Sequence, residues 1–368
     1  MSDNGLEDMN ETVFLTGATG ALGPVLAAEL LASGAAPKLR VLIRGGDTPA
    51  ITRFNQWIGT LESTLAASGS LLPNPRKRVG VIEGDLCAPD LAMSPAQQAQ
   101  FCDETEIIIH AAADTNFRGQ MHWETNVEGT RRLLDLARKC RRLKKLVFVS
   151  TICVAGIQSG LVREEPVVDE PRFANAYERT KWAAERLVLD SDLPIEIVRV
   201  GIVMGSTVTG EVHRLGALHH VFKWFGSGHM PVVPGQPTTL VDLIDSELAA
   251  KVIRKAAQTD AAPGAIYHAA AGRRAVLLQD LCRFCSQQMH DEILEASFRT
   301  LGHHETHSRA HERLAKAWLP VLLASRTYDT SRAEALWGGP LPLSDWRQTL
   351  AKVLRFCGYV DQQRVSVG

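Results

Sequence analysis

The chain has 368 residues, with 40 Lys and Arg against 41 Asp and Glu, a net charge of −1, and 45% of its residues are hydrophobic. This length predicts one large domain or a core with a smaller appended part, and the balanced charge excludes the global positive field of nucleic-acid binders. The seven cysteines are scattered and the polar segment Met1–Glu11 resembles no signal peptide, so we expect a reduced, cytoplasmic protein without a membrane span.

Short β-branched runs alternate with longer helical patterns through about the first 200 residues. This alternation predicts βαβ units and a parallel sheet. Runs such as IIIH and LVFVS are almost wholly apolar, as in strands that helices cover on both faces. We therefore predict an α/β fold with a doubly wound, Rossmann-like parallel sheet. Its expected strands are Thr12–Thr16, Leu39–Ile43, Val79–Glu83, Glu106–His110, Leu146–Ser150 and Ile195–Val200.

The regular alternation fades after Gly205, where a Pro/Gly-rich loop begins. A helix near Ser246–Gln258 and a strand at Ala265–Ala269 are expected to return to the main sheet. We predict a cofactor-binding core at residues 10–205, completed by about 238–272. Residues 206–237 and 273–366 are expected to form a smaller, mainly helical substrate cap.

The strongest motif lies near the start of the chain. In TVFLTGATGALG, Gly17, Gly20 and Gly23 stand between an apolar strand and an expected helix at Ala21–Ala32. Glycines here permit a tight turn and bring the backbone close to a pyrophosphate, which then faces the positive end of the helix dipole. This context predicts a dinucleotide site rather than a merely structural turn.

The end of the second expected strand indicates which dinucleotide is bound. Where an NAD enzyme normally has an acid that grips the ribose 2′-hydroxyl, this sequence reads VLIRG, with Arg44 in its place. An arginine here favours binding of the 2′-phosphate of NADP, and this role of Arg44 is preferred to that of an ordinary solvated residue at a strand end. Arg53 could assist in this binding. We therefore expect NADP(H) as the cofactor.

Tyr177 and Lys181 lie four residues apart on an expected helix and share one of its faces. A nearby ammonium stabilises a phenolate and lowers the pKa of a tyrosine, which can then hand a proton to a developing alkoxide. Ser150 and Thr151 end an apolar strand, at the edge where open α/β sheets bind ligands. These residues form the candidate catalytic centre.

Taken together, TGATGALG, HAAAD, NVEGT, VSTICVAG and YERTK resemble the extended short-chain dehydrogenase/reductase family. The resemblance covers about the first 270 residues and implies a catalytic triad of Thr151, Tyr177 and Lys181. The residues expected to contact the cofactor are Thr16, Gly17, Thr19, Gly20, Ala21, Leu22, Gly23, Arg44, Arg53, Asp85, Leu86, Ala111, Ala112, Ala113, Asn126, Ser150, Tyr177, Lys181, Gly201, Ile202 and Val203.

Two segments identify a branch of this family. Asp47–Arg78 adds a long helical pattern, and the stretch from GDLCAPDL to HAAADTNF resembles thioester reductases and fatty acyl reductases, the male-sterility type. This resemblance implies an NADPH-dependent reductase that converts an acyl thioester, carried on coenzyme A or an acyl carrier protein, to an aldehyde or alcohol. Tyr177 would then be the proton donor.

Two other functions stay open. The first is an NADP-dependent reductase or dehydrogenase of a free ketone, aldehyde or secondary alcohol, which would use the same three residues because the cap selects the substrate. The second is a non-catalytic dinucleotide sensor, which is disfavoured because both Tyr177 and Lys181 are present. The acyl group, the carrier and the oligomeric state are not predicted.

Four further patterns have simpler explanations. The histidines of His303–His311 are expected on a solvated helix, and no metal site is predicted. Cys282 and Cys285 are expected to be buried, and Ala317–Ser325 is expected to pack in the core. The basic run Arg138–Lys145 suits the end of a helix, with docking of a carrier protein or of coenzyme A phosphates as the alternative.

Overall fold

The computed structural model describes residues 11–115, 122–225, 236–260, 263–289 and 324–360. Within them, seven parallel strands form one large sheet in the order β11-β7-β5-β4-β1-β2-β3. The strands are β1 (Thr12–Thr16), β2 (Lys38–Ile43), β3 (Val79–Glu83), β4 (Ile107–His110), β5 (Lys145–Thr151), β7 (Ile195–Val200) and β11 (Ile266–Ala269). The predicted doubly wound parallel sheet is therefore confirmed.

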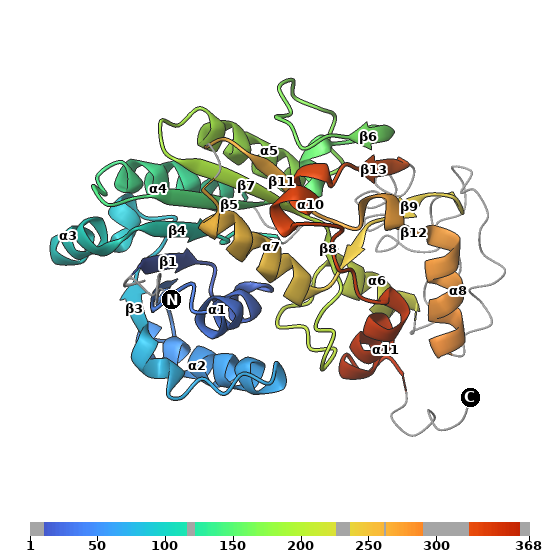
Figure 1. The fold of residues 1–368 in the computed structure, drawn as a ribbon, viewed down its shortest axis with the longest axis horizontal. Coiled ribbons are helices and arrows are strands. Elements are labelled where there is room, and N and C mark those ends of the chain that lie inside the picture. The colour runs from blue at the N-terminus through green and yellow to red at the C-terminus, as the bar shows by residue number, and fades with distance from the viewer. Residues whose placement is uncertain (1–10, 116–121, 226–235, 261–262, 290–323, 361–368) are drawn as a thin grey trace, which may run out of the picture.

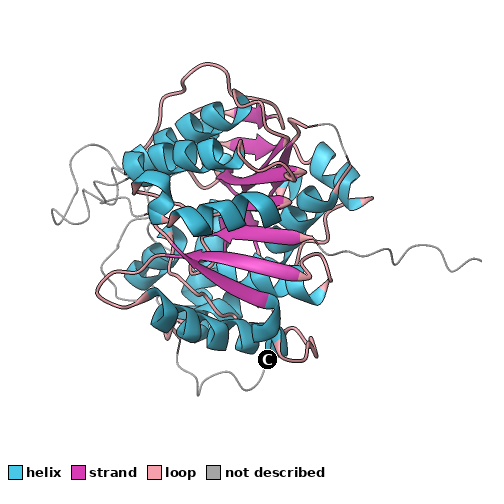
Figure 2. Ribbon diagram, turned by 90° about the vertical axis from the view of Figure 1, so that its left-hand side faces the viewer, coloured by secondary structure: helices cyan, strands magenta, loops and turns pink. Residues whose placement is uncertain are grey.

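Helices cover both faces of this sheet, so that the strands form a middle layer (Figures 1 and 2). Successive side chains along a strand therefore point to opposite faces of the sheet. In β1, Val13 and Leu15 pack in one core cluster and Phe14 packs in the other. The first cluster includes the helices α1 (Gly23–Ala32), α2 (Ala50–Ala67) and α7 (Ser246–Gln258). The second includes α3 (Pro95–Glu104), α4 (Gly129–Ala137) and α5 (Ala176–Leu189).

Side chains at the helix starts explain several of the boundaries. Ser94 forms a capping box with Gln97 at the start of α3. Asn175 accepts a hydrogen bond from the backbone N–H of Glu178 at the start of α5, and Asp245 does the same for Leu248 at α7. Such caps satisfy N–H groups that the first turn of a helix leaves free.

The direction of strand order reverses between β1 and β4, which are neighbours in the sheet although β2 and β3 separate them in sequence. In open α/β sheets, ligands bind outside the carboxyl ends of the strands at such a reversal. Thr16 and His110, the last residues of the two strands, are in register there. This edge is where the candidate site is expected.

A second core lies beyond the end of β7 (right-hand side of Figure 1). Its helices are α6 (Ala217–Phe225), α8 (Leu278–Met289) and α11 (Trp346–Phe356). Two short strand pairs accompany it: β8 (Ile202–Val203) with β10 (Leu243–Ile244), and β9 (Leu240–Val241) with β12 (Val276–Leu277). A third pair, β6 (Gly160–Val162) with β13 (Arg326–Tyr328), contributes to a small separate cluster. The helix α10 (Ser331–Trp337) instead packs against β11 and α7 through Ala333, although residues 273–366 were expected in the cap.

The remaining helical turns are short. They are the 3₁₀ turns Pro75–Arg78, Pro89–Ala92, Ile152–Ala155 and Gly272–Arg274 and the π-helical turn Glu124–Glu128. Among the helices that the structure describes, none has the length and apolar character required to cross a bilayer.

Candidate active site

The turn between β1 and α1 is built on close backbone contacts. Gly17 has a φ of +76°, and a Cβ atom there would lie 2.5 Å from the Ala112 nitrogen. A Cβ on Gly23 would lie 2.0 Å from the carbonyl oxygen of Ala18. The backbone N–H of Gly20 donates to the Gly17 carbonyl at 2.9 Å, which closes the turn. Gly17 and Gly23 are thus required sterically, and α1 begins directly behind the turn.

A buried hydrogen-bond chain fixes the ends of β1 and β4 beside this turn. Thr16 Oγ1 lies 2.6 Å from His110 Nδ1 and accepts from the Ala112 N–H at 3.2 Å, while His110 Nε2 lies 3.0 Å from Thr130 Oγ1. Burial, assisted by Lys181, lowers the pKa of His110 to about 3, so its imidazole is neutral at physiological pH. Sequence reasoning missed His110, although it is the first residue of the HAAAD motif.

Asn126 lies in the π-helical turn before α4, a type of irregularity that is frequent at functional sites. Its side chain accepts from the Asp114 N–H at 2.7 Å and donates to the Asp114 carbonyl and to Thr180 Oγ1. Thr180 in turn donates to the Tyr177 carbonyl at 3.0 Å. Asn126 therefore connects the loop after β4 with the first turn of α5.

The hydroxyls of Thr151 and Tyr177 meet between the end of β5 and the start of α5. Thr151 Oγ1 also accepts the Cys153 N–H at 3.2 Å, and it forms a hydrogen bond with the Tyr177 side chain. Burial and the neighbouring Cys153 raise the pKa of Tyr177 above its ordinary value, against the opposing effect of the Thr151 hydrogen bond. The pKa of Tyr177 is thus raised and not lowered as the sequence predicts, because burial outweighs any effect of a nearby ammonium. Tyr177 is therefore protonated at neutral pH and has a proton to give.

Lys181 follows Tyr177 by one helical turn and is almost fully buried. Its Nζ donates to the Val149 carbonyl at 2.8 Å and lies 4.1 Å from the centre of the Phe148 ring. Burial lowers the pKa of Lys181 to about 7, although the Glu185 carboxylate opposes the shift. Small changes in the surroundings of Lys181 can therefore change its charge near neutral pH.

Ser150 provides a test of whether this edge suits a polar cofactor. Its Oγ is buried and has no hydrogen-bond partner among the described residues. A buried hydroxyl without a partner is costly, so it is a natural place for a ligand group to bind. Together with the glycine turn, which leaves no room for side chains, the residues at this edge fit a dinucleotide.

The stretch after β7 is held by a buried carboxylate. A Cβ on Gly201 would lie 2.7 Å from Asp242 Oδ1, and the Ile202 N–H donates to the Asp242 carbonyl at 2.9 Å. The Asp242 carboxylate accepts the N–H groups of Ala271 and Gly272 at 2.8 and 2.9 Å. Burial raises the pKa of Asp242 to about 6. Asp242 is a second residue that sequence reasoning missed, because its partners lie about 30 and 40 residues away in the chain.

The basic residues expected at the cofactor lie beyond β2. Arg44 is exposed directly after this strand, and Arg53 on α2 donates to the Arg44 carbonyl at 2.6 Å. Asp85 and Leu86 follow the neighbouring β3, where the Leu86 carbonyl accepts from Arg132 at 3.0 Å. This group lies on the β2 side of the strand reversal, whereas Thr151 lies on the β5 side.

All of the expected site residues on strand ends therefore share the carboxyl edge of the sheet. They are Thr16 at the end of β1 and Gly17 and Thr19–Gly23 after it, Arg44 after β2, Asp85 and Leu86 after β3, Ala111–Ala113 after β4, Ser150 and Thr151 on β5, and Gly201–Val203 after β7. Arg53, Asn126, Tyr177 and Lys181 come from helical segments next to this edge. The residues expected to bind the cofactor and those expected to be catalytic thus form one row across the strand reversal.

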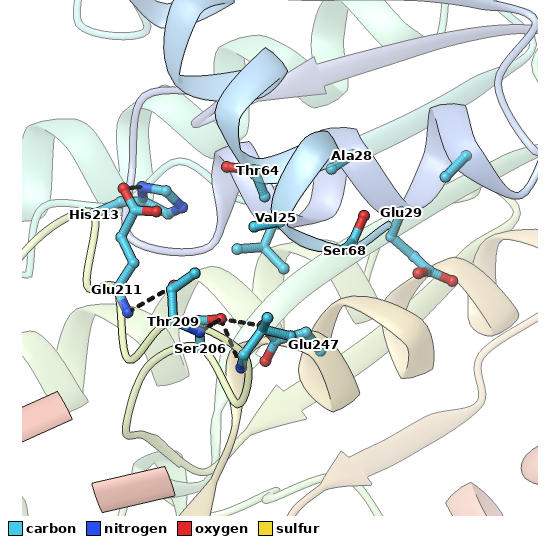
Figure 3. A pocket seen from close by; sticks show the side chains of 13 residues that line it. Val25, Ala28, Glu29, Thr64, Ser68, Ser206, Thr209, Glu211, His213 and Glu247 are labelled. Atoms are coloured by element: carbon cyan, nitrogen blue, oxygen red, sulfur yellow. Dashed lines mark hydrogen bonds and ion pairs between the residues drawn. The ribbon is translucent and has the colours of Figure 1, made fainter. Parts of the chain in front are cut away.

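A separate pocket lies between α1, α2, α7 and the loop after β8 (Figure 3). None of the expected site residues lines it. Its three carboxylates are already engaged, in the pairs Glu29–Arg254 at 2.8 Å, Glu211–His213 at 3.2 Å and Glu247–Ser206 at 2.6 Å. The pocket is therefore distinct from the candidate active site, and each of its carboxylates already has a polar partner within the chain.

The basic run at the end of α4 lies at the opposite edge of the sheet, beside the amino ends of β4 and β5. Its ion pairs are Arg138 with Asp135 and Asp192, Arg142 with Glu106, Lys144 with Glu11, and Lys145 with Glu196. These ion pairs, and the distance of the run from the candidate site, favour the interpretation that the basic residues suit the end of a helix. They disfavour the alternative that the run docks a carrier protein.

The other patterns noted in the sequence add no site. Cys282 and Cys285 are buried in α8, where burial raises the pKa of both thiols. No cluster of His, Cys, Asp and Glu suited to a metal ion occurs in the described ranges. The His303–His311 cluster and most of Ala317–Ser325 lie outside those ranges.

The order of the strands, the glycine turn at their reversal and the YxxxK helix are features of the extended short-chain dehydrogenase/reductase class. Within this class, the model of the male sterility protein family matches residues 15–253, more than half of the chain. The chain belongs to this family.

Two relatives of known name are similar to this chain. An alcohol-forming fatty acyl-CoA reductase of Simmondsia chinensis is 25% identical over 304 residues, which are 65% of this chain and 61% of that protein. An isonitrile lipopeptide synthase of Streptomyces coeruleorubidus is 31% identical over 221 residues, which are 58% of this chain and 14% of that protein. The chain thus spans less than two thirds of either relative.

A solved structure shows the same fold. The terminal R domain from the myxalamid PKS-NRPS biosynthetic pathway superposes with a TM-score of 0.76 at 22% sequence identity. The match covers 96% of this chain and 92% of that chain, so it includes the second core as well as the main sheet.

Proposed function

We propose that the protein is an NADPH-dependent reductase that converts an acyl thioester to an aldehyde or alcohol. The observation that carries the proposal is the hydrogen bond between the Thr151 and Tyr177 hydroxyls, one helical turn from the buried Lys181. Membership of the male sterility protein family supports the proposal further, because a relative of this chain is a fatty acyl-CoA reductase. Thr151, Tyr177 and Lys181 are the proposed catalytic residues.

The chemistry assigned to these residues is proton donation to a carbonyl oxygen. Bound NADPH would supply a hydride to the thioester carbon. As negative charge develops on the oxygen, the hydroxyls of Thr151 and Tyr177 stabilise it by hydrogen bonds and Tyr177 supplies the proton. Charge on Lys181 favours the resulting phenolate. Cleavage of the carbon–sulfur bond then releases a thiol and an aldehyde, and a second reduction gives the alcohol.

NADP(H) is the proposed cofactor because of the basic groups beyond β2. Arg44 is exposed at the position where an acid would repel a 2′-phosphate, and Arg53 lies against its backbone. The pyrophosphate would lie at the turn of Gly17 and Gly20, before the start of α1. All seven cysteines are free, which supports the proposed reduced, cytoplasmic location.

The proposed substrate is bound through a thioester to coenzyme A or to an acyl carrier protein. The fatty acyl-CoA reductase among the relatives supports coenzyme A as the source, and a carrier protein is the second source that the experiment includes. The proposed boundary of the substrate-selecting part is residues 206–237 and 273–366, apart from α10, which packs against the main sheet. A free ketone, aldehyde or secondary alcohol is the alternative substrate class, and the experiment below separates the two.

The test combines the purified chain with NADPH and a series of acyl-CoA esters of increasing chain length. NADPH oxidation and thiol release are measured together, since reduction to the aldehyde gives one thiol per NADPH and reduction to the alcohol gives one per two. The same esters attached to a carrier protein form the second arm, and Tyr177→Phe is the control. Turnover of free ketones without any thiol release would refute the proposal.

A further inference from the structure

We propose that Trp57 is a positioning residue of the dinucleotide site, because its indole holds the glycine turn in its binding shape. This inference rests on the proposed function, since it assumes that the turn after β1 binds the cofactor. Trp57 lies on α2, the long helix after the second strand, and it was not among the expected site residues. The evidence is a buried hydrogen bond to the turn itself.

Trp57 Nε1 donates to the Ala18 carbonyl oxygen at 2.8 Å. Both residues are buried, with 4% of Trp57 and none of Ala18 exposed. The same oxygen occupies the space that a side chain on Gly23 would need, 2.0 Å from the position of a Cβ atom. The Ala18 carbonyl is therefore held between the start of α1 and the indole.

The direction of this carbonyl determines what the exposed side of the turn offers a ligand. A trans peptide unit is planar, so the Ala18 C=O and the Thr19 N–H point in opposite directions. Because the carbonyl points toward the buried Trp57, the Thr19 N–H points away from it, and Thr19 is exposed. An N–H fixed in this way, just before a helix, is a donor prepared for an anion.

Neighbouring residues on α2 hold the indole in place and extend its effect. Phe54 stacks near it with ring centres 6.1 Å apart, and Ile58 and Leu61 are buried in the same core cluster. Arg53, one turn earlier, donates to the Arg44 carbonyl at 2.6 Å. One helix thus contacts the turns after both β1 and β2.

These two contacts predict different effects on cofactor binding. The turn after β1 is proposed to meet the pyrophosphate, which NADPH and NADH share. Loss of the Trp57 bond should therefore weaken both dinucleotides equally. Arg44 and Arg53 are proposed to meet the 2′-phosphate, so their loss should weaken NADPH alone.

The experiment replaces Trp57 with Phe in the full chain and measures the equilibrium Kd of NADPH and of NADH by calorimetry. We expect both Kd values to rise about tenfold, because the Ala18 carbonyl loses its donor and the turn its fixed shape. The ratio of the two Kd values and the kcat at saturating NADPH should stay within about twofold of the wild type. Unchanged Kd values would overturn the proposal.

Trp182→Phe is the matched control, since the Trp182 indole also donates to a backbone carbonyl, that of Val167 at 2.9 Å. This variant should bind both dinucleotides like the wild type, and an equal loss in both variants would refute a specific role of Trp57. If Trp57→Phe does not fold, benzothienylalanine at position 57 removes the N–H while retaining the ring shape, and wild-type binding by that protein refutes the proposal. A wild-type chain that binds neither dinucleotide would instead refute the proposed function.

Discussion

Replacement of Lys181 by Met tests the burial of the proposed catalytic lysine through the pH dependence of stability. Burial lowers the pKa of Lys181 from 10.5 to about 7. Below pH 7 the lysine is charged in both the folded and the unfolded chain, so the full cost of burying the charge is present. Between about pH 7 and 10.5 only the unfolded chain keeps the proton, so the stability of the wild type rises with pH.

The size of this effect follows from the shift itself. A pKa lowered from 10.5 to about 7 corresponds to about 5 kcal/mol between the charged and neutral forms. Between pH 7 and pH 9 the wild type should therefore gain about 2 kcal/mol relative to Lys181→Met. His110, whose pKa Lys181 helps to lower to about 3, titrates outside this window. Loss of the hydrogen bond to Val149 adds only an offset that does not change with pH.

The assay is urea unfolding of the wild type and of Lys181→Met, without cofactor, at several values between pH 7 and pH 9. Lys139→Met serves as the control, because Lys139 is exposed at the end of α4. The difference in unfolding free energy should change with pH for Lys181→Met and stay constant for Lys139→Met. A constant difference for both variants would show that Lys181 is fully charged throughout, and would refute the reasoning from burial.

Three further substitutions address the remaining parts of the site. Tyr177→Phe should lower kcat by at least about 100-fold with little change in the Kd of NADPH, as measured by steady-state kinetics and calorimetry, because it removes only the proton donor. Arg44→Asp should shift the ratio of NADPH to NADH affinity toward NADH by at least about tenfold, and an unchanged ratio would show that another group selects the cofactor. Asn126→Ala should lower the free energy of urea unfolding by about 2–3 kcal/mol, because it removes the side-chain hydrogen bonds to the backbone N–H and carbonyl of Asp114 and to Thr180.

The strands of the main sheet could be predicted because each is a short apolar run between polar segments, as in buried parallel strands. All six strands expected in the first 200 residues begin and end within one residue of the observed limits. Three of them have the predicted limits at both ends, and Lys145–Thr151 extends one residue further at each end than predicted. The short pairs β8–β10 and β9–β12 could not be predicted, because two residues show no periodicity. Only contacts formed in the folded chain define them.

The same distinction applies to the candidate site. Residues in glycine-rich or YxxxK patterns could be proposed from the sequence, because their chemistry depends on near neighbours in the chain. His110 and Trp57 could not, since His110 binds Thr16 across 94 residues and Trp57 binds Ala18 across 39. Their importance depends on contacts between separate elements, which no local pattern records.

The path of the chain has a consequence for protein engineering. It leaves the main sheet after β7 for the second core, returns for α7 and β11, and leaves again at β12. It comes back once more at α10 before α11 rejoins the second core, while β13 pairs with the distant β6. No single continuous stretch of sequence therefore contains the second core. A transplant of one segment from a relative would cut across both cores, so changes to the second core, the proposed substrate-selecting part, are better made by individual substitutions in place.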